Sequence, residues 1–200
     1  MGKFKDKEKA IIREQLVREG GRLFSSFGLK KTSVEDITAA CGIGKGTFYL
    51  FFKTKEELLL EILNAEEIET HTHIRKMTES GKLTVESFAA ILEDTFIRFY
   101  DTSVSKTLYE LDEFPLLFRK ISDEQAEENY QRDMALSTFI LSKLPEQKMK
   151  PEILMGLLRS IFLATLHKDI IGVEVFKDVM KLQIRYIAQG LLGTNQEDFK

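Results

Sequence analysis

Apolar residues recur at three- and four-residue intervals along most of the chain, which is the spacing of one face of an α-helix. Polar residues occupy the opposite faces, and only three prolines occur in the 200 residues. We therefore expect an all-α fold built from amphipathic helices. The pattern predicts helices at 7–27, 34–41, 44–51 and 54–78, and after residue 84 a series of longer helices that includes 123–144, 151–166 and 173–192.

The segment from residue 32 to 55 has the local signals of a helix-turn-helix. The Ser33 hydroxyl can accept a hydrogen bond from the first N–H groups of a helix, and Asp36 stands where the acid of a capping box is found. The apolar pattern stops at Gly42, which can adopt the left-handed conformation that ends a helix and reverses the chain. A second short helix at 44–51 follows this turn.

This second helix carries polar groups at its start, whereas phenylalanines anchor it from behind. In a DNA-reading helix the N-terminal residues face the base edges of the major groove. Lys45 can donate to guanine, and the methyl group of Thr47 can meet a thymine methyl. Gly46 lets the backbone approach closely. Lys55 stands at the head of the next helix, where a lysine suits a phosphate.

Three motifs follow one another here, namely T-S-V-E-D-I at 32–37, G-I-G-K-G-T-F-Y at 42–49 and F-F-K-T-K-E-E-L at 51–58. With these motifs, residues 11–63 resemble the N-terminal DNA-binding domain of the TetR family of bacterial transcriptional regulators. Two departures from the family pattern occur. Gly20-Gly21 stands where alanines are usual, and Gly44 replaces a common serine.

The resemblance implies a ligand-responsive regulator, usually a repressor in this family, that binds a near-palindromic DNA operator as a homodimer. It places a small-molecule effector in the C-terminal half of the chain. The DNA contacts that it implies come from Thr32, Ser33, Lys45, Gly46, Thr47, Tyr49 and Lys55. The central three would face bases and the others phosphates.

The distribution of charge agrees with a DNA-binding N-terminus. The net charge of the whole chain is −3, but residues 1–55 hold twelve Lys or Arg against six Asp or Glu. A local excess of cations is what a phosphate-facing domain needs, because affinity depends on the number of phosphates neutralised. Lys3, Lys5, Lys7 and Lys9 are either a basic arm that lies along DNA or an ordinary solvated start of the chain.

We divide the chain into a helix-turn-helix domain at 1–53, a connecting helix at 54–71 and a regulatory domain at 72–200. The connecting helix joins the DNA reader to the regulatory domain in the family that the chain resembles. Its tilt is therefore expected to carry the signal between them.

Aromatic residues are frequent in the stretch that begins at Val85, which is typical of an apolar ligand pocket but also of an ordinary core. For any single residue, core packing is the simpler explanation. The resemblance favours a pocket, and an uncharged or lipophilic effector would suit such walls. The lining that we predict is Phe88, Phe96, Tyr100, Tyr109, Phe118 and Tyr130.

The last two helices are apolar over broad faces, which predicts pairing with a second copy in a four-helix bundle. The resemblance implies a dimer contact in the same place. The alternative is burial of both helices inside one larger bundle of the same chain. The predicted contact residues are Leu154, Leu158, Ile161, Phe162, Phe176, Val179, Met180 and Ile187.

Other classes of function have less support in the sequence. His71 and His73 lie on a predicted helix with acidic residues nearby, which suggests a metal site. No cysteine or third histidine lies near enough in the sequence to complete one. We find no nucleophile motif, P-loop or zinc-protease motif, so we predict neither enzymatic activity nor a cofactor. A DNA-binding protein without a small-molecule ligand, whose C-terminal half serves dimerisation or protein contact, stays an alternative.

The expected location is the cytoplasm. Cys41 is the sole cysteine, so no intramolecular disulfide can form, as is usual in a reducing compartment. No apolar run is long enough to span a bilayer, and the N-terminus lacks the apolar core of a signal peptide. We therefore expect no membrane partner.

Overall fold

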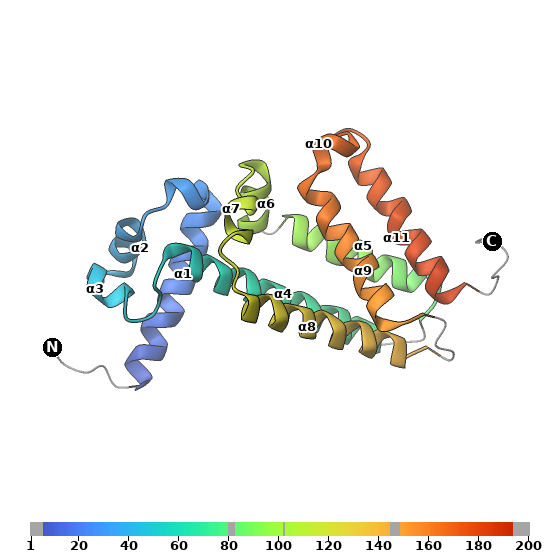
Figure 1. Ribbon diagram of the computed structural model, residues 1–200, viewed down its shortest axis with the longest axis horizontal. Coiled ribbons are helices and arrows are strands. Elements are labelled where there is room, and N and C mark those ends of the chain that lie inside the picture. The colour runs from blue at the N-terminus through green and yellow to red at the C-terminus, as the bar shows by residue number, and fades with distance from the viewer. Residues whose placement is uncertain (1–5, 80–82, 102, 145–148, 194–200) are drawn as a thin grey trace. The chain divides into compact units, whose positions relative to one another are not determined.

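The computed structural model describes residues 6–79, 83–101, 103–144 and 149–193, which fold as helices joined by turns (Figure 1). No strand occurs in these ranges, so the predicted all-α fold is confirmed. The helices are α1 (Asp6–Lys31), α2 (Val34–Cys41), α3 (Lys45–Phe48), α4 (Lys55–Glu79), α5 (Val85–Asp101), α6 (Ser103–Glu110), α7 (Phe114–Phe118), α8 (Asp123–Ser142), α9 (Pro151–Leu166), α10 (Lys168–Ile171) and α11 (Phe176–Leu192).

The helices form two compact units. Unit 1 comprises Met1–Ile68 and Asp101–Lys120, and unit 2 comprises Glu69–Tyr100 and Ile121–Lys200. The predicted domain division placed all residues after 71 together, whereas α6 and α7 lie in unit 1 with the helix-turn-helix. The physical reason is that α6 packs along α1, a contact between distant parts of the sequence that periodicity does not reveal.

Local signals correctly located the ends of α2. The Ser33 hydroxyl accepts a hydrogen bond from the Asp36 N–H at 3.1 Å, and the Asp36 carboxylate accepts one from the Ser33 N–H at 2.9 Å. This capping box satisfies two backbone donors at the start of the helix. Gly42 ends α2 in the left-handed conformation with φ 65°. The hydrogen bonds from Ser33 also hold the pKa of Asp36 below its usual value.

The contact between α1 and α4 explains one of the unusual glycines in α1. A Cβ atom at Gly20 would lie 2.7 Å from the Leu58 Cδ2 atom, and Leu58 is fully buried. At Gly21 the nearest atom to such a Cβ, on Ile62, would be 3.9 Å away, which is ordinary contact. Gly20 therefore allows close packing of two helices, whereas Gly21 has no such role in unit 1.

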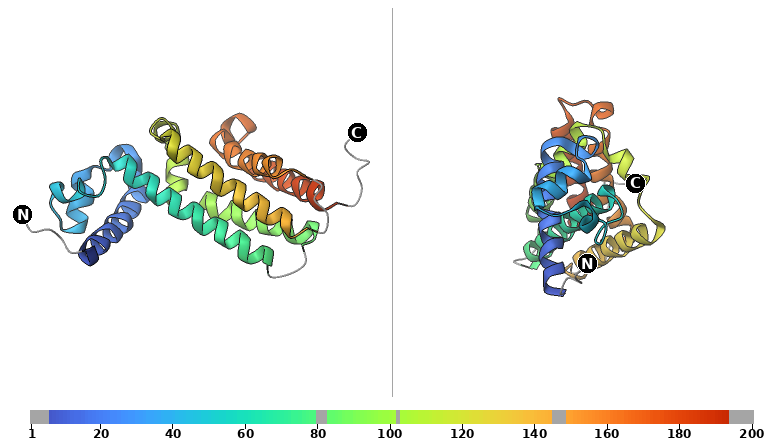
Figure 2. Two further views of the ribbon diagram at one scale, coloured as in Figure 1. Left: turned by 60° about the horizontal axis from the view of Figure 1, so that its bottom comes forward. Right: turned by 90° about the vertical axis from the view of Figure 1, so that its left-hand side faces the viewer.

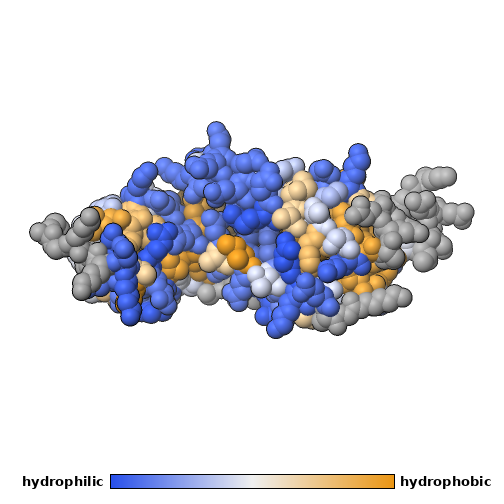
Figure 3. Space-filling model, turned by 90° about the horizontal axis from the view of Figure 1, so that it is seen from below, coloured by the Kyte–Doolittle hydropathy of each residue, from blue (hydrophilic) through white to orange (hydrophobic). Residues whose placement is uncertain are grey.

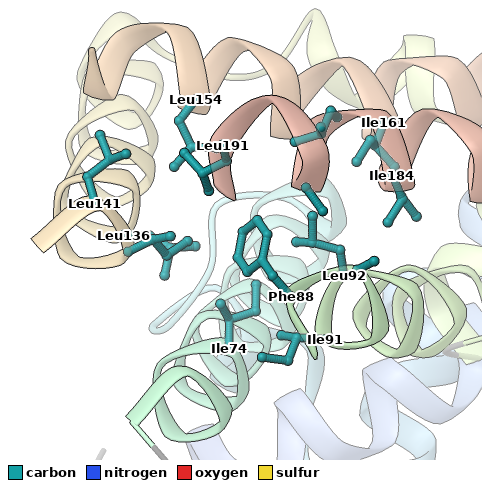
Figure 4. Packing of buried hydrophobic residues seen from close by; sticks show 14 of the residues in the cluster. Ile74, Phe88, Ile91, Leu92, Leu136, Leu141, Leu154, Ile161, Ile184 and Leu191 are labelled. Atoms are coloured by element: carbon teal, nitrogen blue, oxygen red, sulfur yellow. The ribbon is translucent and has the colours of Figure 1, made fainter. Parts of the chain in front are cut away.

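Unit 2 is built around a hydrophobic core in which α8, α9 and α11 lie side by side (Figures 1 and 2). Phe88 of α5 has no exposed surface and points into the centre of this core (Figure 4). Apolar residues of the other helices surround it, namely Ile74 of α4, Leu136 and Leu141 of α8, Leu154 of α9, and Ile184 and Leu191 of α11.

The ends of the helices in unit 2 agree with most of the predicted ranges. Ser122 begins α8 with a capping box to Gln125, and Pro151 occupies the first turn of α9. The predicted helix at 173–192 begins later, at Phe176, because the short helix α10 and a turn at Gly172 (φ 108°) precede it. Local sequence signals did not indicate α10.

Two histidines of α4 contact carboxylates on other helices of unit 2. The His71 Nε2 atom lies 3.3 Å from the Asp133 carboxylate on α8, and His73 lies 2.8 Å from Asp94 on α5. Asp133 also accepts a hydrogen bond from the Arg159 Nε atom of α9 at 2.5 Å. Burial raises the pKa of Asp133, but the bonds from His71 and Arg159 outweigh it, so the pKa is lowered. Asp133 thus joins three helices.

Polar side chains predominate on the face shown in Figure 3, where apolar side chains form separate patches. Among the helices that the structure describes, none combines the length and the apolar character needed to cross a bilayer. The cytoplasmic location stays a prediction.

Gly21→Ala should raise the free energy of unfolding by about 0.5–1 kcal/mol, because alanine loses less conformational entropy in a helix than glycine. Gly20→Ala should instead lower it, because displacing the buried Leu58 side chain costs about 1–3 kcal/mol. Denaturant unfolding of the two variants checks this. Equal stabilisation by both substitutions would contradict the close packing of α1 on α4.

Asp133→Asn should lower the free energy of unfolding by about 1–2 kcal/mol at neutral pH, because His71 and Arg159 lose an ionised partner. A lowered carboxyl pKa contributes stability above its ordinary value of 3.8, and this contribution is lost as the pH falls through the folded-state pKa. The difference in unfolding free energy between the parent protein and Asp133→Asn should therefore become smaller in acid. Asp94→Asn, at a more exposed site, is the control and should cost less. Equal costs would contradict the role given to Asp133.

Candidate nucleic-acid interface

The turn between α2 and α3 sets the geometry of the candidate reading helix. The Gly42 N–H donates to the Ala39 carbonyl at 3.2 Å, and the Ile43 N–H donates to the Thr38 carbonyl at 3.0 Å. These bonds satisfy carbonyl groups at the end of α2 while the chain reverses. The helix-turn-helix predicted from the sequence is present. Its second helix, α3, is shorter than predicted and spans Lys45–Phe48, and hydrogen-bonded turns follow as far as Phe51.

One side of α3 packs in the hydrophobic core, and the other side is exposed to solvent. Phe48 is fully buried and packs against the ring of Phe52, with 5.8 Å between the ring centroids. On the other side, a Cβ atom at Gly44 or Gly46 would meet no atom within 4 Å. Tyr49 is 52% exposed, so its phenol group is accessible. The arrangement presents bare backbone and polar side chains on a rigid apolar support.

Lys45 is exposed but not isolated, because its ammonium group forms an ion pair with the Glu35 carboxylate of α2. The hydrogen bond from Lys45 lowers the pKa of Glu35, and the same bond raises the pKa of Lys45. Glu35 therefore competes with a base for the donors of Lys45. The ion pair was not foreseen from the sequence, although the ten-residue spacing across a tight turn permits it.

Thr32 and Lys55 stabilise the α1–α2 connection. We define this connection as residues 28–33, because Gly28 interrupts the helical conformation near the end of α1. Thr32 is only 1% exposed, and its hydroxyl donates to the Gly28 carbonyl at 2.7 Å. The Lys55 Nζ atom donates to the carbonyl oxygens of Leu29 at 2.6 Å and Thr32 at 2.7 Å. In this conformation these groups bind the protein's own backbone. The expected phosphate contacts of Thr32 and Lys55 stay predictions, and in this conformation both side chains hold the connection in place.

A buried carboxylate holds the same connection from the side of α6 and α7. Glu113, which is 2% exposed, accepts hydrogen bonds from the Leu29 N–H at 2.5 Å and the Lys30 N–H at 3.2 Å. Gly28 turns the chain here with φ 76°, and a Cβ atom at this position would lie 2.7 Å from the Glu113 Oε2 atom. Glycine is thus required both for the left-handed φ and for the approach of Glu113.

Comparison with protein families gives a match to the model described as bacterial regulatory proteins, tetR family, over residues 16–62. The N-terminal domain belongs to the TetR family. Among curated relatives, the uncharacterized HTH-type transcriptional regulator YuxN of Bacillus subtilis is 42% identical over 77 residues, which are 38% of this chain and 25% of YuxN. The chain thus spans about a quarter of the length of such relatives.

The TetR-family fold extends beyond the matched domain. A TetR-family regulator from Pectobacterium atrosepticum superposes with a TM-score of 0.72 at 16% identity, covering 96% of this chain and 100% of that chain. A complex of SmeT with triclosan superposes with a TM-score of 0.62 at 18% identity, covering 92% and 93%. SmeT is a repressor of a multidrug efflux pump of Stenotrophomonas maltophilia. At sequence identities this low, the structural similarity shows the fold alone.

The six aromatic residues predicted to line a pocket are divided between the units. Tyr109 and Phe118 lie in unit 1, where both pack against the ring of Phe114, with centroids 4.6 and 5.9 Å away. In unit 2, Phe88 is at the centre of the core, Phe96 packs against Phe176, and Tyr130 lies beneath the Arg159 guanidinium. Tyr100 belongs to α5, but its side chain lies outside the described part of the chain. The lining stays a prediction.

The predicted dimer residues are mostly core residues of the chain itself. Leu154, Ile161, Phe176, Met180 and Ile187 are each at most 8% exposed within one copy, and Leu158 and Phe162 are half-buried. Of the eight, only Val179 is exposed. Periodicity identified the apolar face of each helix correctly but did not tell which face the same chain covers.

A different set of apolar residues is exposed on α11 and α9. Val175, Val179, Leu182 and Tyr186 recur at steps of four, three and four and are 39–54% exposed. This spacing places them along one stripe of α11 and its N-cap residue Val175, opposite the buried residues. On α9, Ile153 and Leu163 are both 52% exposed. The sequence contained this second stripe, but the predicted residues came mainly from the stronger apolar stripe on the opposite side of the helix.

Lys45→Ala should relax base preference at one position of a binding site, with discrimination there falling on the order of tenfold. Glu35→Gln should strengthen DNA binding, because it removes both the competing partner of Lys45 and a negative charge beside the groove. Binding to a selected duplex and to its single-base variants measures both effects. Tyr49→Phe, which preserves the ring, is the control for base preference. If Lys45→Ala left that preference unchanged, the assignment of Lys45 to a base would be wrong.

Proposed function

We propose that this protein is a DNA-binding transcriptional regulator that reads an operator with α3. The observation that carries the proposal is the open face of α3, with Gly44, Gly46 and Tyr49 accessible and Phe48 buried behind them, within a TetR-family domain. A backbone without side-chain cover can approach base edges closely, and a buried ring fixes its position. A role as repressor has support from fold neighbours such as SmeT.

We further propose that two copies pair and present two reading helices to adjacent major grooves, which requires a near-palindromic operator. The exposed stripe of α11 supports this pairing. Val175, Val179, Leu182 and Tyr186 leave an apolar strip on a helix that already fills its own core on the opposite side. Covering such a strip with a second copy removes apolar surface from water and so stabilises the pair.

A small, largely apolar effector is the third part of the proposal. Support comes from the fold neighbour SmeT, whose structure contains triclosan, and from the aromatic residues of unit 2. A ligand can shift DNA binding only by its difference in affinity for the two states of the protein. A regulator without a ligand is the competing possibility, and it predicts that no apolar compound raises the thermal unfolding temperature.

Selection of genomic fragments by the purified protein, followed by footprinting, tests DNA reading. The proposal predicts recovery of a near-palindromic sequence, together with loss of preference at one position in each half-site for Lys45→Ala. Recovery of fragments without any common sequence would contradict it. No catalytic turnover is expected on any substrate.

Leu182→Glu should weaken pairing of two copies by at least about tenfold, because it buries a charge in an apolar contact. Lys181→Glu, which also introduces a carboxylate at an exposed position of α11, is the matched control. Sedimentation equilibrium measures the dissociation constant of each variant. A parent protein that is monomeric at all concentrations, or a dimer unaffected by Leu182→Glu, would overturn the proposed interface.

A further inference from the structure

The end of α7 forms a basic pocket with the α1–α2 connection and the start of α4. Its volume is about 410 Å³, and it belongs entirely to unit 1. Its lining consists of Leu29, Lys30, Lys55, Glu56, Leu116, Arg119 and Lys120. The pocket thus combines four cationic side chains with one carboxylate.

Three of these cations have no protein partner within the described part of the chain. Lys30, Arg119 and Lys120 are exposed and form no ion pair there, whereas the Lys55 ammonium is bonded to backbone carbonyls. Like charges held around one hollow repel one another and create a positive potential that concentrates anions. The arrangement is therefore better suited to an anionic group than to an apolar ligand.

The position of α7 in unit 1 is fixed by specific contacts. Glu113 is bonded to the backbone of the α1–α2 connection, and the Thr107 hydroxyl of α6 donates to the Ser25 carbonyl of α1 at 2.6 Å. Phe114 and Leu117 are both buried, so α7 is packed as well as tethered. These contacts hold Arg119 and Lys120 beside Lys30.

We propose that this pocket binds a backbone phosphate of DNA, so that α7 extends the DNA interface beyond the helix-turn-helix. The inference rests on the proposed function. Two observations favour DNA over a free anion: the cations Lys30, Arg119 and Lys120 stand at an open surface, and the connection that lines the pocket leads directly into the capping residue of α2. Contacts of this kind add affinity and fix position but do not read sequence.

Arg119→Gln and Lys120→Gln test the proposal in binding to a random-sequence duplex over a range of salt concentrations. Each variant should reduce the slope of log affinity against log salt by about 0.9 for each phosphate that it no longer neutralises. The same relation predicts that affinity falls by about fivefold for each such phosphate near 0.15 M salt. Because both side chains are exposed, the thermal unfolding temperature should stay unchanged.

Lys106→Gln, at an exposed position of α6 outside the pocket, is the matched control for removal of one positive charge and should leave the slope unchanged. Arg119→Lys should retain the slope, since it keeps the charge. A slope that falls equally for Lys106→Gln and Arg119→Gln would overturn the proposal, because a general charge effect would then explain it.

The control for the proposed function is base preference on a selected duplex, which Arg119→Gln and Lys120→Gln should preserve. If the parent binds DNA and both variants keep its slope, the phosphate site is wrong and the DNA-binding function stands. If these variants instead lose saturable binding of inorganic phosphate while their DNA slope is unchanged, the pocket takes a free anion and the assignment to DNA is overturned. A parent that binds no duplex contradicts both proposals.

Discussion

The structure of the reading unit depends on two charged side chains that bind the backbone of the α1–α2 connection. Glu113 accepts the N–H groups of Leu29 and Lys30, and Lys55 donates to the carbonyls of Leu29 and Thr32. Together they satisfy donors and acceptors that the turn at Gly28 removes from regular helix bonding. Charge-assisted bonds of this kind are stronger than neutral ones, so the entry to α2 is held firmly.

This arrangement joins a segment from the middle of the chain to the DNA-reading unit. Residues 101–120 supply Glu113, a polar contact to α1 and the buried side chains of α7. A displacement of α6 or α7 would therefore act directly on the connection that leads into the helix-turn-helix. The sequence indicated α4 alone as the link to the reading unit, whereas the contacts within unit 1 show that α6 and α7 also support this unit.

The sequence predicted those features that neighbouring residues determine. Ser33, Asp36 and Gly42 fixed both ends of α2, because capping bonds and a left-handed turn are local. Glu113 was missed, since its partners lie more than 80 residues away and no motif marks a buried carboxylate. The predicted dimer contact stays a prediction, since helical periodicity located apolar stripes on α11, whereas only tertiary contacts show that Met180 is covered within one copy and Leu182 is not.

Amide hydrogen exchange at Leu29 and Lys30 tests the central claim most directly, because these N–H groups are the ones that Glu113 binds. The account predicts slow exchange of both amides in the parent protein and much faster exchange in Glu113→Ala, with the amides of α8 unaffected. Exchange of Leu29 and Lys30 in the parent at the rate of unprotected amides would contradict it, since the α1–α2 connection would then lack the support described.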